Sequence, residues 1–256
     1  MDEAGGQAWT AGVVGDADGV AESLSAAGLR TVEGDTESVL AADPAVVVAV
    51  GESSLLGLAR RAPPVPILPV EAGRGVRSVP REALAEVGER LAAGDWSVEE
   101  HPLLGLAWDG ERTTAFFDAM LVTAEPADIS EFTVRADGEH VARFRADGVV
   151  ATTPAGSPGY TRTAGGPVVD PDLDVLVVVP VAPFATSLGH WVVPPEISLR
   201  VERDEAAVEV LADDRSAGDA PVGGPVCLAP TDRVEVVRVP EGLSPFGRRE
   251  RELEKL

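Results

Sequence analysis

Short apolar runs alternate with helix-like segments over the first hundred residues of the chain. We expect strands at residues 10–14, 29–32, 45–50 and 65–70. We expect helices at residues 21–27, 51–60 and 80–93, the last with Pro80 at its start and Gly94 just past its end. The unbroken run AVVVAV at 45–50 is typical of a strand buried on both faces. This alternation predicts a parallel sheet that helices cover on both faces.

The pattern changes near residue 95, and from residue 106 onward the apolar runs resemble strands. We expect these strands at residues 113–117, 119–123, 131–135, 140–145, 149–152, 175–179, 197–203, 206–211 and 233–238. The segment ADGE at 136–139 is a hairpin signal, and RSAGDAPVGGP at 215–225 predicts a turn-rich connection. The second part of the chain is therefore predicted to be a mostly antiparallel β domain.

The charge of the chain narrows its possible partners. The 256 residues include 43 acidic and 21 basic side chains, for a net charge of −22, and the acids are spread along the sequence. Nucleic acid and anionic membrane surfaces would be repelled, so we expect neither as a partner. Such an excess is typical of adaptation to high salt, because a Debye length of ~3 Å at 1 M screens self-repulsion. An ordinary acidic bacterial protein is the alternative.

Other features limit the chemistry and the compartment. The single cysteine, Cys227, excludes an internal disulfide framework and a thiolate zinc site. The three histidines are scattered, so we expect no metal site built from them. The longest apolar run, at 175–182, is too short to cross a bilayer, and the chain does not start with a leader pattern. We therefore expect a soluble, cytoplasmic protein.

The segment VGESS at 50–54 is the first candidate site. A buried strand that runs into Gly51, Ser53 and Ser54 and then a helix would place backbone N–H groups and hydroxyls around an anion. Glu52 would lie beside that anion, where its carboxylate could accept a proton from a hydroxyl nucleophile. The alternative is structural: Ser53 or Ser54 caps the helix and Glu52 is a surface charge.

The second candidate is the stretch RADGVVATTPAGSPGYTRTAGGPVV at 145–169, which is rich in small residues. Its glycines permit close backbone approach or positive φ. Polar groups able to meet a ligand are Ser157, Tyr160, Thr163 and the carboxylate of Asp147. The residues alone favour a ligand-binding loop and a complicated turn about equally.

The order of these motifs resembles the NAD kinase family. The family series GDG, TPTGSTAY and SAGGP corresponds here to RADG at 145–148, TPAGSPGY at 153–160 and TAGGP at 163–167. The match continues through LDVLVVVPVAPFA at 173–185 and HWVVPP at 190–195.

The first part of the chain shows the same order of motifs less specifically. VGESS lies where the family has GGDGT, and PVEAGRGVRSV at 69–79 is similar to the family segment GVNLGRLGFLT. FFDAML at 116–121 lies where the family carries an Asn-Glu pair in ALNEVVI. The resemblance thus covers nearly the whole chain.

The resemblance implies a two-domain fold. It consists of a Rossmann-like α/β domain at 1–98 and an antiparallel β-sandwich at 99–238, with residues 239–256 packing back on the first domain. It also implies that NAD binds in the cleft between the domains, within a homodimer or homotetramer. The implied reaction transfers phosphate from ATP or polyphosphate to the 2′-hydroxyl of the adenosine ribose of NAD or NADH, with Mg²⁺ accompanying the donor.

The resemblance also implies roles for individual residues. Glu52 takes the place of the catalytic Asp that activates the ribose hydroxyl, and Asp118 stands for the Glu of the Asn-Glu pair. Asp147 would reach the adenine across a subunit interface. The other residues implied in NAD binding are Gly51, Ser53, Ser54, Ser157, Gly159, Tyr160 and Thr163.

Several family positions differ in this chain. The family Asp is Glu52, the Asn of the Asn-Glu pair is Phe117, and the other substituted positions are Val50, Ser53, Glu71 and Pro158. Two hypotheses follow: a working NAD kinase, or a catalytically degenerate paralogue that serves as a nucleotide-binding or regulatory subunit. A kinase for another hydroxyl substrate is a third. If the substitutions reduce activity, restoring GGDGT at 50–54 and Asn-Glu at 117–118 should raise NADP formation.

Overall fold

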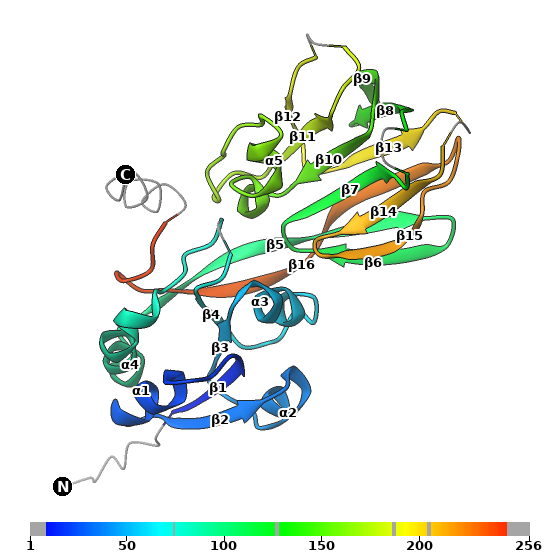
Figure 1. Ribbon diagram of the computed structural model, residues 1–256. Coiled ribbons are helices and arrows are strands. Elements are labelled where there is room, and N and C mark those ends of the chain that lie inside the picture. The colour runs from blue at the N-terminus through cyan, green and yellow to red at the C-terminus, as the bar shows by residue number, and fades with distance from the viewer. Residues whose placement is uncertain (1–8, 74, 126–127, 186–187, 204–205, 245–256) are drawn as a thin grey trace, which may run out of the picture. The chain divides into compact units, whose positions relative to one another are not determined.

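The computed structural model describes residues 9–73, 75–125, 128–185, 188–203 and 206–244. The chain forms two compact units (Figure 1). The first contains the described residues up to His101 and from Val234 onward, and the second contains Pro102–Arg233. The tail from 245, including the charged segment RRERELEKL, lies outside the described residues.

The first unit is an α/β fold. Its elements are β1 (Thr10–Gly15), α1 (Val20–Ala26), β2 (Arg30–Gly34), α2 (Thr36–Ala41), β3 (Val46–Val50), α3 (Glu52–Ala59), β4 (Ile67–Val70), the 3₁₀ helix η1 (Arg81–Ala83) and α4 (Leu84–Ala93). The sheet order is β2-β1-β3-β4, and every pairing among these four strands is parallel. The predicted parallel sheet is therefore confirmed.

Helices cover both faces of this sheet (Figure 1). Alternate residues of each strand point to opposite faces, and on one face Val46 and Val48 pack with Leu24 of α1 and Leu91 of α4. On the other face Val39 of α2 lies directly over Gly12 of β1; a Cβ at Gly12 would lie 2.3 Å from a methyl of Val39. All five residues of β3 are buried, as the AVVVAV run predicts.

Two helices begin differently from what the sequence predicts. α3 begins at Glu52 with Gly51 as its N-cap, so neither Ser53 nor Ser54 is the cap. The predicted helix at 80–93 begins as a 3₁₀ turn and becomes α-helical at Leu84. It ends at Gly94, whose φ of 71° is the left-handed conformation that glycine adopts at little cost.

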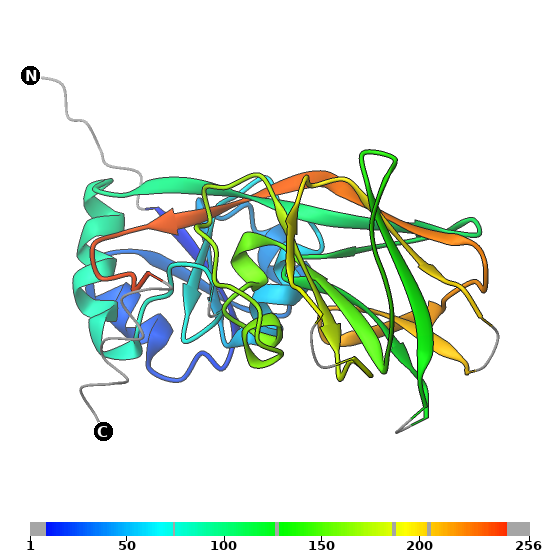
Figure 2. The ribbon, with the colours of Figure 1, turned by 90° about the horizontal axis from the view of Figure 1, so that it is seen from above.

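The second unit is a β-sandwich with its own core. One set of strands has the order β16 (Pro225–Arg238), β13 (Ile197–Val201), β8 (Ser130–Ala136) and β9 (Glu139–Ala146), and β5 (Ser97–Trp108) pairs with both β16 and β6 (Glu111–Ala115). The first residues of β5 and the last residues of β16 belong to the first unit. The other sheet has the order β12 (Trp191–Val193), β11 (Leu176–Val181), β10 (Gly148–Thr152), β7 (Asp118–Thr123), β14 (Val208–Ala212) and β15 (Arg215–Asp219). Figure 2 shows β5 and β16 side by side.

The inward faces of the two sheets form one apolar core. Phe132 and Leu199 from the first sheet pack with Leu121, Val149 and Val178 from the second. The antiparallel pairings confirm the predicted second domain, and β8 and β9 confirm the hairpin at 136–139. The short elements η2 (Pro154–Gly156) and α5 (Tyr160–Thr163) follow β10.

One expectation about the elements is wrong, and two features of the fold were not expected. Residues 215–219 form strand β15 and residues from 225 belong to β16, so 215–225 is not simply a connection. β5 starts at Ser97, ahead of the strands expected from the sequence, and α2 was not expected.

No helix among the described residues is long and apolar enough to span a membrane.

Candidate functional site

The carboxyl edge of the parallel sheet in the first unit brings acidic residues together. Gly15 of β1 pairs with Val50 of β3, and Val50 pairs with Val70 of β4, so the last residues of three neighbouring strands are in register. The residues that follow this row are Asp16, Gly51 and Glu71. Glu52 comes one residue after Gly51, so three carboxylates follow adjacent strand ends.

Glu52 lies at the start of a helix, in contact with solvent. Gly51 precedes it with φ 82° and ψ 157°, a conformation that essentially only glycine adopts. The Glu52 side chain is exposed, and within the described part of the chain it has no hydrogen-bond or ion-pair partner. Its carboxylate is therefore available to a ligand.

The two serines after Glu52 have different surroundings. Ser53 is exposed, whereas Ser54 is half-buried against the end of β1. A Cβ built on Gly15 would lie 2.4 Å from Ser54 Oγ and 2.3 Å from the Val50 carbonyl oxygen, so only glycine fits at position 15. This contact fixes the start of α3 against β1.

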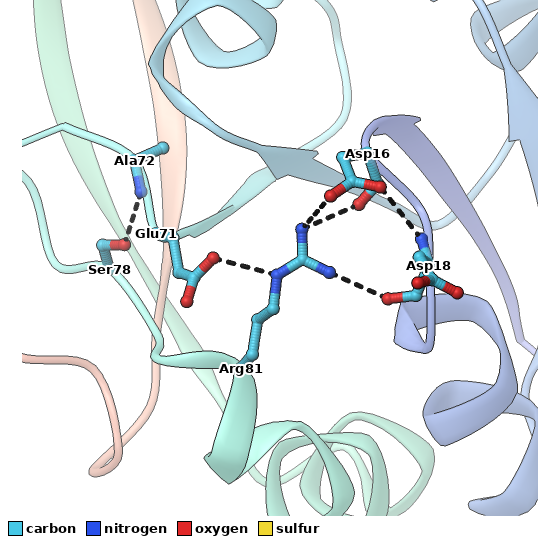
Figure 3. A network of polar contacts seen from close by, with 6 residues as sticks. All are labelled: Asp16, Asp18, Glu71, Ala72, Ser78 and Arg81. Atoms are coloured by element: carbon cyan, nitrogen blue, oxygen red, sulfur yellow. Dashed lines mark hydrogen bonds and ion pairs between the residues drawn. The ribbon is translucent and has the colours of Figure 1, made fainter.

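Arg81 connects two of the strand ends (Figure 3). Its Nε donates to Glu71 Oε2 at 2.9 Å, and its Nη2 donates to Asp16 Oδ2 at 2.8 Å and to the Asp16 carbonyl. Its Nη1 donates to the carbonyl of Asp18 at 2.8 Å. These bonds, the one to Glu71 above all, raise the pKa of the Arg81 guanidinium. Because β3 lies between β1 and β4, Arg81 links the two strands that flank the one ahead of Glu52.

In the second unit, Asp118 begins β7 and lies next to Thr152 in register. It is half-buried. The preceding side chain, Phe117, is only 8% exposed and its ring lies 4.8 Å from that of Phe116. Position 117 therefore carries a buried apolar ring, where the resemblance implies an amide.

The stretch rich in small residues folds over the outer face of β10 and β11. Gly156 allows the chain to pass the Phe117 carbonyl, because a Cβ there would lie 2.2 Å from that oxygen. Gly166 lies equally close to Thr161 and Val179, each 2.7 Å from a built Cβ. These two glycines make room for the protein's own chain.

The hydroxyl of Ser157 also has partners inside the loop. Ser157 is fully buried, and its Oγ donates to the Pro154 carbonyl at 2.7 Å and accepts from the Val169 N–H at 3.1 Å. Tyr160 at 43% exposure and Thr163 are on the surface, and Gly159 is half-buried. Tyr160 and Thr163 can thus meet a ligand through their side chains, whereas Ser157 holds the loop in shape.

Asp147 lies apart from the other candidates in the second unit. It precedes Gly148 at one end of β10, whereas Asp118 pairs with Thr152 at the other end. Thr152 is five residue steps of extended chain from Asp147, or about 17 Å at ~3.4 Å per step. One copy of the second unit therefore does not bring Asp147 and Asp118 to the same point.

Two groups of residues were not expected from the sequence. Asp16 could have been found from the rule that residues after parallel strands meet at one edge, whereas Arg81, eleven residues after the end of β4, has no such signal. Asp213, which binds the turn before β7, has no sequence signal beyond its place in a hairpin turn. No cluster of three or more His, Cys, Asp or Glu side chains that could hold a metal ion occurs in the described ranges.

Comparison with known proteins identifies the family. A family model described as the ATP-NAD kinase C-terminal domain matches residues 118–236. The NAD kinase of Gemmatimonas aurantiaca is 32% identical over 210 residues, which cover 77% of this chain and 72% of that protein. The NAD kinase of Methanosphaera stadtmanae is 31% identical over 156 residues, covering 59% of this chain and 57% of that protein. The chain belongs to the NAD kinase family.

Solved structures show the same fold. An NAD kinase from Archaeoglobus fulgidus in complex with ATP superposes with a TM-score of 0.71 at 24% identity, over 89% of this chain and 92% of that one. Yeast NADH kinase complexed with NADH gives a TM-score of 0.79 at 16% identity, over 97% and 88%. The predicted two-part architecture, an α/β domain followed by a β-sandwich, is confirmed.

Proposed function

We propose that the protein transfers a phosphoryl group from ATP or polyphosphate to the 2′-hydroxyl of the adenosine ribose of NAD or NADH. The observation that carries this proposal is the position of Glu52. It is a solvent-exposed carboxylate that has no hydrogen-bond or ion-pair partner among the described residues, and it comes directly after a buried strand and a glycine of positive φ. The family's catalytic Asp occupies the same place in GGDGT.

The proposed reaction consists of a proton transfer to Glu52 and a phosphoryl transfer to the ribose oxygen. The Glu52 carboxylate accepts the proton of the ribose hydroxyl, and the hydroxyl oxygen forms a bond to the terminal phosphorus of the donor. The bond from that phosphorus to its bridging oxygen breaks, and ADP or a shortened polyphosphate leaves with the electron pair. Asp118 accepts a hydrogen bond from the ribose, and Tyr160 and Thr163 contact the bases.

The same proposal includes Mg²⁺ with the phosphate donor. When bound, Mg²⁺ would neutralise charge on the donor phosphates, and in such sites one or two carboxylates together with substrate phosphates suffice to bind it. Asp16 and Glu71 at the sheet edge would be the carboxylates that hold Mg²⁺, and each is also bound to Arg81. Glu52 remains for the proton transfer.

Oligomerisation and compartment also belong to the proposal. The separation of about 17 Å between Asp147 and Thr152, estimated from the rise of β10, supports a homodimer or homotetramer in which a second copy supplies Asp147 to the adenine. Sedimentation analysis of the purified protein tests this, and a monomer that forms NADP would contradict it. Because the substrates are intracellular nucleotides, we place the activity in the cytoplasm.

Replacing Glu52 with Gln tests the proposed reaction. We expect Glu52→Gln to reduce NADP formation by about a hundredfold or more, within the range of a lost general base, while NAD binding stays within about threefold. Glu86→Gln is the matched control, because Glu86 is also exposed in the first turn of a helix of the same unit. NADP would be measured with ATP and with polyphosphate in molar KCl containing Mg²⁺. Equal rates for wild type and Glu52→Gln would contradict the role of Glu52.

One observation favours a second function. The buried ring of Phe117 removes the amide that the family offers to the ribose, so binding without turnover is the alternative outcome. Calorimetry of NAD binding in the same samples separates the two functions. Binding with no NADP formed would identify a nucleotide-binding or regulatory subunit, and neither binding nor turnover would refute both.

A further inference from the structure

The turn before β7 is bound by the carboxylate of one residue that is distant in sequence. Asp213 lies in the turn between β14 and β15, with φ 53°, a left-handed conformation that Asp tolerates better than most residues. Its Oδ1 accepts from the backbone N–H of Phe117 at 2.7 Å, of Phe116 at 3.1 Å and of Asp118 at 3.2 Å. Its Oδ2 accepts from the Phe116 N–H at 2.9 Å.

Three successive N–H groups that point at one carboxylate form a concave anion-binding arrangement of the backbone. Hydrogen bonds to an ionised acceptor are roughly twice as strong as those between neutral groups. The backbone of Asp213 adds a further bond, since its N–H donates to the Asp118 carbonyl at 2.9 Å. Asp213 therefore holds the first residue of β7 through both its side chain and its main chain.

The carbonyl groups of the same turn accept hydrogen bonds from Thr152 and Thr153. Thr152 Oγ1 donates to the Phe117 carbonyl at 2.8 Å, and Thr153 Oγ1 donates to the Phe116 carbonyl at 2.9 Å. The Thr153 N–H also donates to the Phe117 carbonyl, at 2.9 Å. The N–H side of the turn thus depends on Asp213, and the carbonyl side depends on the last residue of β10 and the residue after it.

We propose that Asp213 is a positioning residue, which fixes the Asp118 carboxylate for the ribose of the dinucleotide. The inference rests on the proposed function. With the Phe117 ring buried, Asp118 is the member of the pair left to contact a ribose, so the orientation of its backbone sets the geometry of that contact. An Asn at 213 offers these N–H groups a neutral amide oxygen in place of the carboxylate, so the N–H side of the turn is held more weakly and the position of Asp118 is less well fixed.

The test compares Asp213→Asn with Asp118→Asn and with the double variant. Asp109→Asn is the matched control, because Asp109 also has a positive φ, 42°, in a hairpin turn of the same unit and is exposed. We expect Asp213→Asn to weaken NAD binding about tenfold, the effect of losing one charge-assisted hydrogen bond, and Asp109→Asn to leave it unchanged. If Asp213 acts through Asp118, the double variant binds no more weakly than Asp118→Asn alone.

Each outcome decides the proposal. Unchanged binding by folded Asp213→Asn, or losses that multiply in the double variant, would overturn it. Wild-type protein that binds no NAD would instead refute the proposed function, and with it the role of Asp118 as a contact to the ribose.

Amide hydrogen exchange of the wild type tests the geometry without any variant. We expect the N–H groups of residues 116–118 to exchange much more slowly than those of the exposed turn at 109–110, and equal rates would also overturn the proposal.

Discussion

At the scale of single residues, position 117 shows how a substitution changes the surroundings of a site. Phe117 is 8% exposed and packs against Phe116, while its backbone carbonyl accepts bonds from Thr152 and Thr153. The backbone of the turn is thus held by polar contacts, and the side chain is a buried ring packed against another ring. Restoring an amide here would place a polar group among apolar ones.

We therefore expect Phe117→Asn to destabilise the protein. The variant loses a buried aromatic ring and buries an amide, which together cost about 3 kcal/mol or more. Phe184→Asn is the control, because Phe184 is 75% exposed and its replacement should change stability little. Denaturant unfolding of both variants measures the difference. An Asn variant as stable as the wild type, with higher NADP formation, would show instead that position 117 can face a ligand without cost.

At the scale of elements, one carboxylate joins three strands of the sandwich. Glu131 on β8 accepts two hydrogen bonds from Arg143 on β9, each 3.0 Å, and one of 2.7 Å from Arg203, which follows β13. The bonds from Arg143 and then from Arg203 outweigh the effect of burial and lower the pKa of Glu131 from its ordinary value of 4.5. This cluster lies on strands whose pairing is otherwise set by backbone hydrogen bonds.

The lowered pKa predicts a pH dependence of stability. A carboxyl group with a depressed pKa in the folded state contributes fully above its unfolded pKa, and the contribution is lost as the pH falls from 4.5 through the folded pKa. We expect Glu131→Gln to lower the thermal midpoint by roughly 1–3 °C at neutral pH, an effect that shrinks below pH 4.5. Glu139→Gln, on an exposed residue of β9, serves as the control. A difference that is independent of pH would contradict the role of the ionised group.

The elements that the sequence predicts are those whose stability comes from a regular apolar pattern. β3 and α4 carry such patterns, and both lie within a few residues of the expected bounds. α2 has one buried residue, Val39, and depends on the cap that Asp35 provides to Ser38, so its six residues give almost no periodic signal. β15, RSAGD, has no buried side chain and exists because β14 pairs with it.

The candidate site could be predicted only in part, for the same reason. Glu52 was a candidate from its place between a strand and a helix and Asp118 was implied by the resemblance, but the surroundings of both depend on contacts between distant segments. Arg81 meets Asp16 across 65 positions, and Asp213 meets Phe117 across 96. A single sequence carries no local pattern for either contact.

At the scale of the whole molecule, the net charge of −22 opposes folding in dilute buffer. The acids cover both units, and at the sheet edge Asp16, Glu52 and Glu71 follow three adjacent strands. Local ion pairs such as that of Arg81 offset only part of this repulsion, since acids outnumber bases by 43 to 21. Stability should therefore depend on the ionic strength of the solution.

We expect the thermal midpoint to rise by several degrees as KCl increases from 0.1 to 1 M. Over this range the Debye length falls from about 10 Å to ~3 Å, so repulsion between like charges on neighbouring side chains is screened. Calorimetric scans in KCl, NaCl and choline chloride at equal ionic strength measure the effect and its cause. Equal rises in all three salts identify screening, whereas a rise in KCl alone identifies specific potassium binding. A midpoint that is unchanged or lower at 1 M would refute adaptation to high salt and favour an ordinary acidic protein, whose ion pairs are weakened by the same screening.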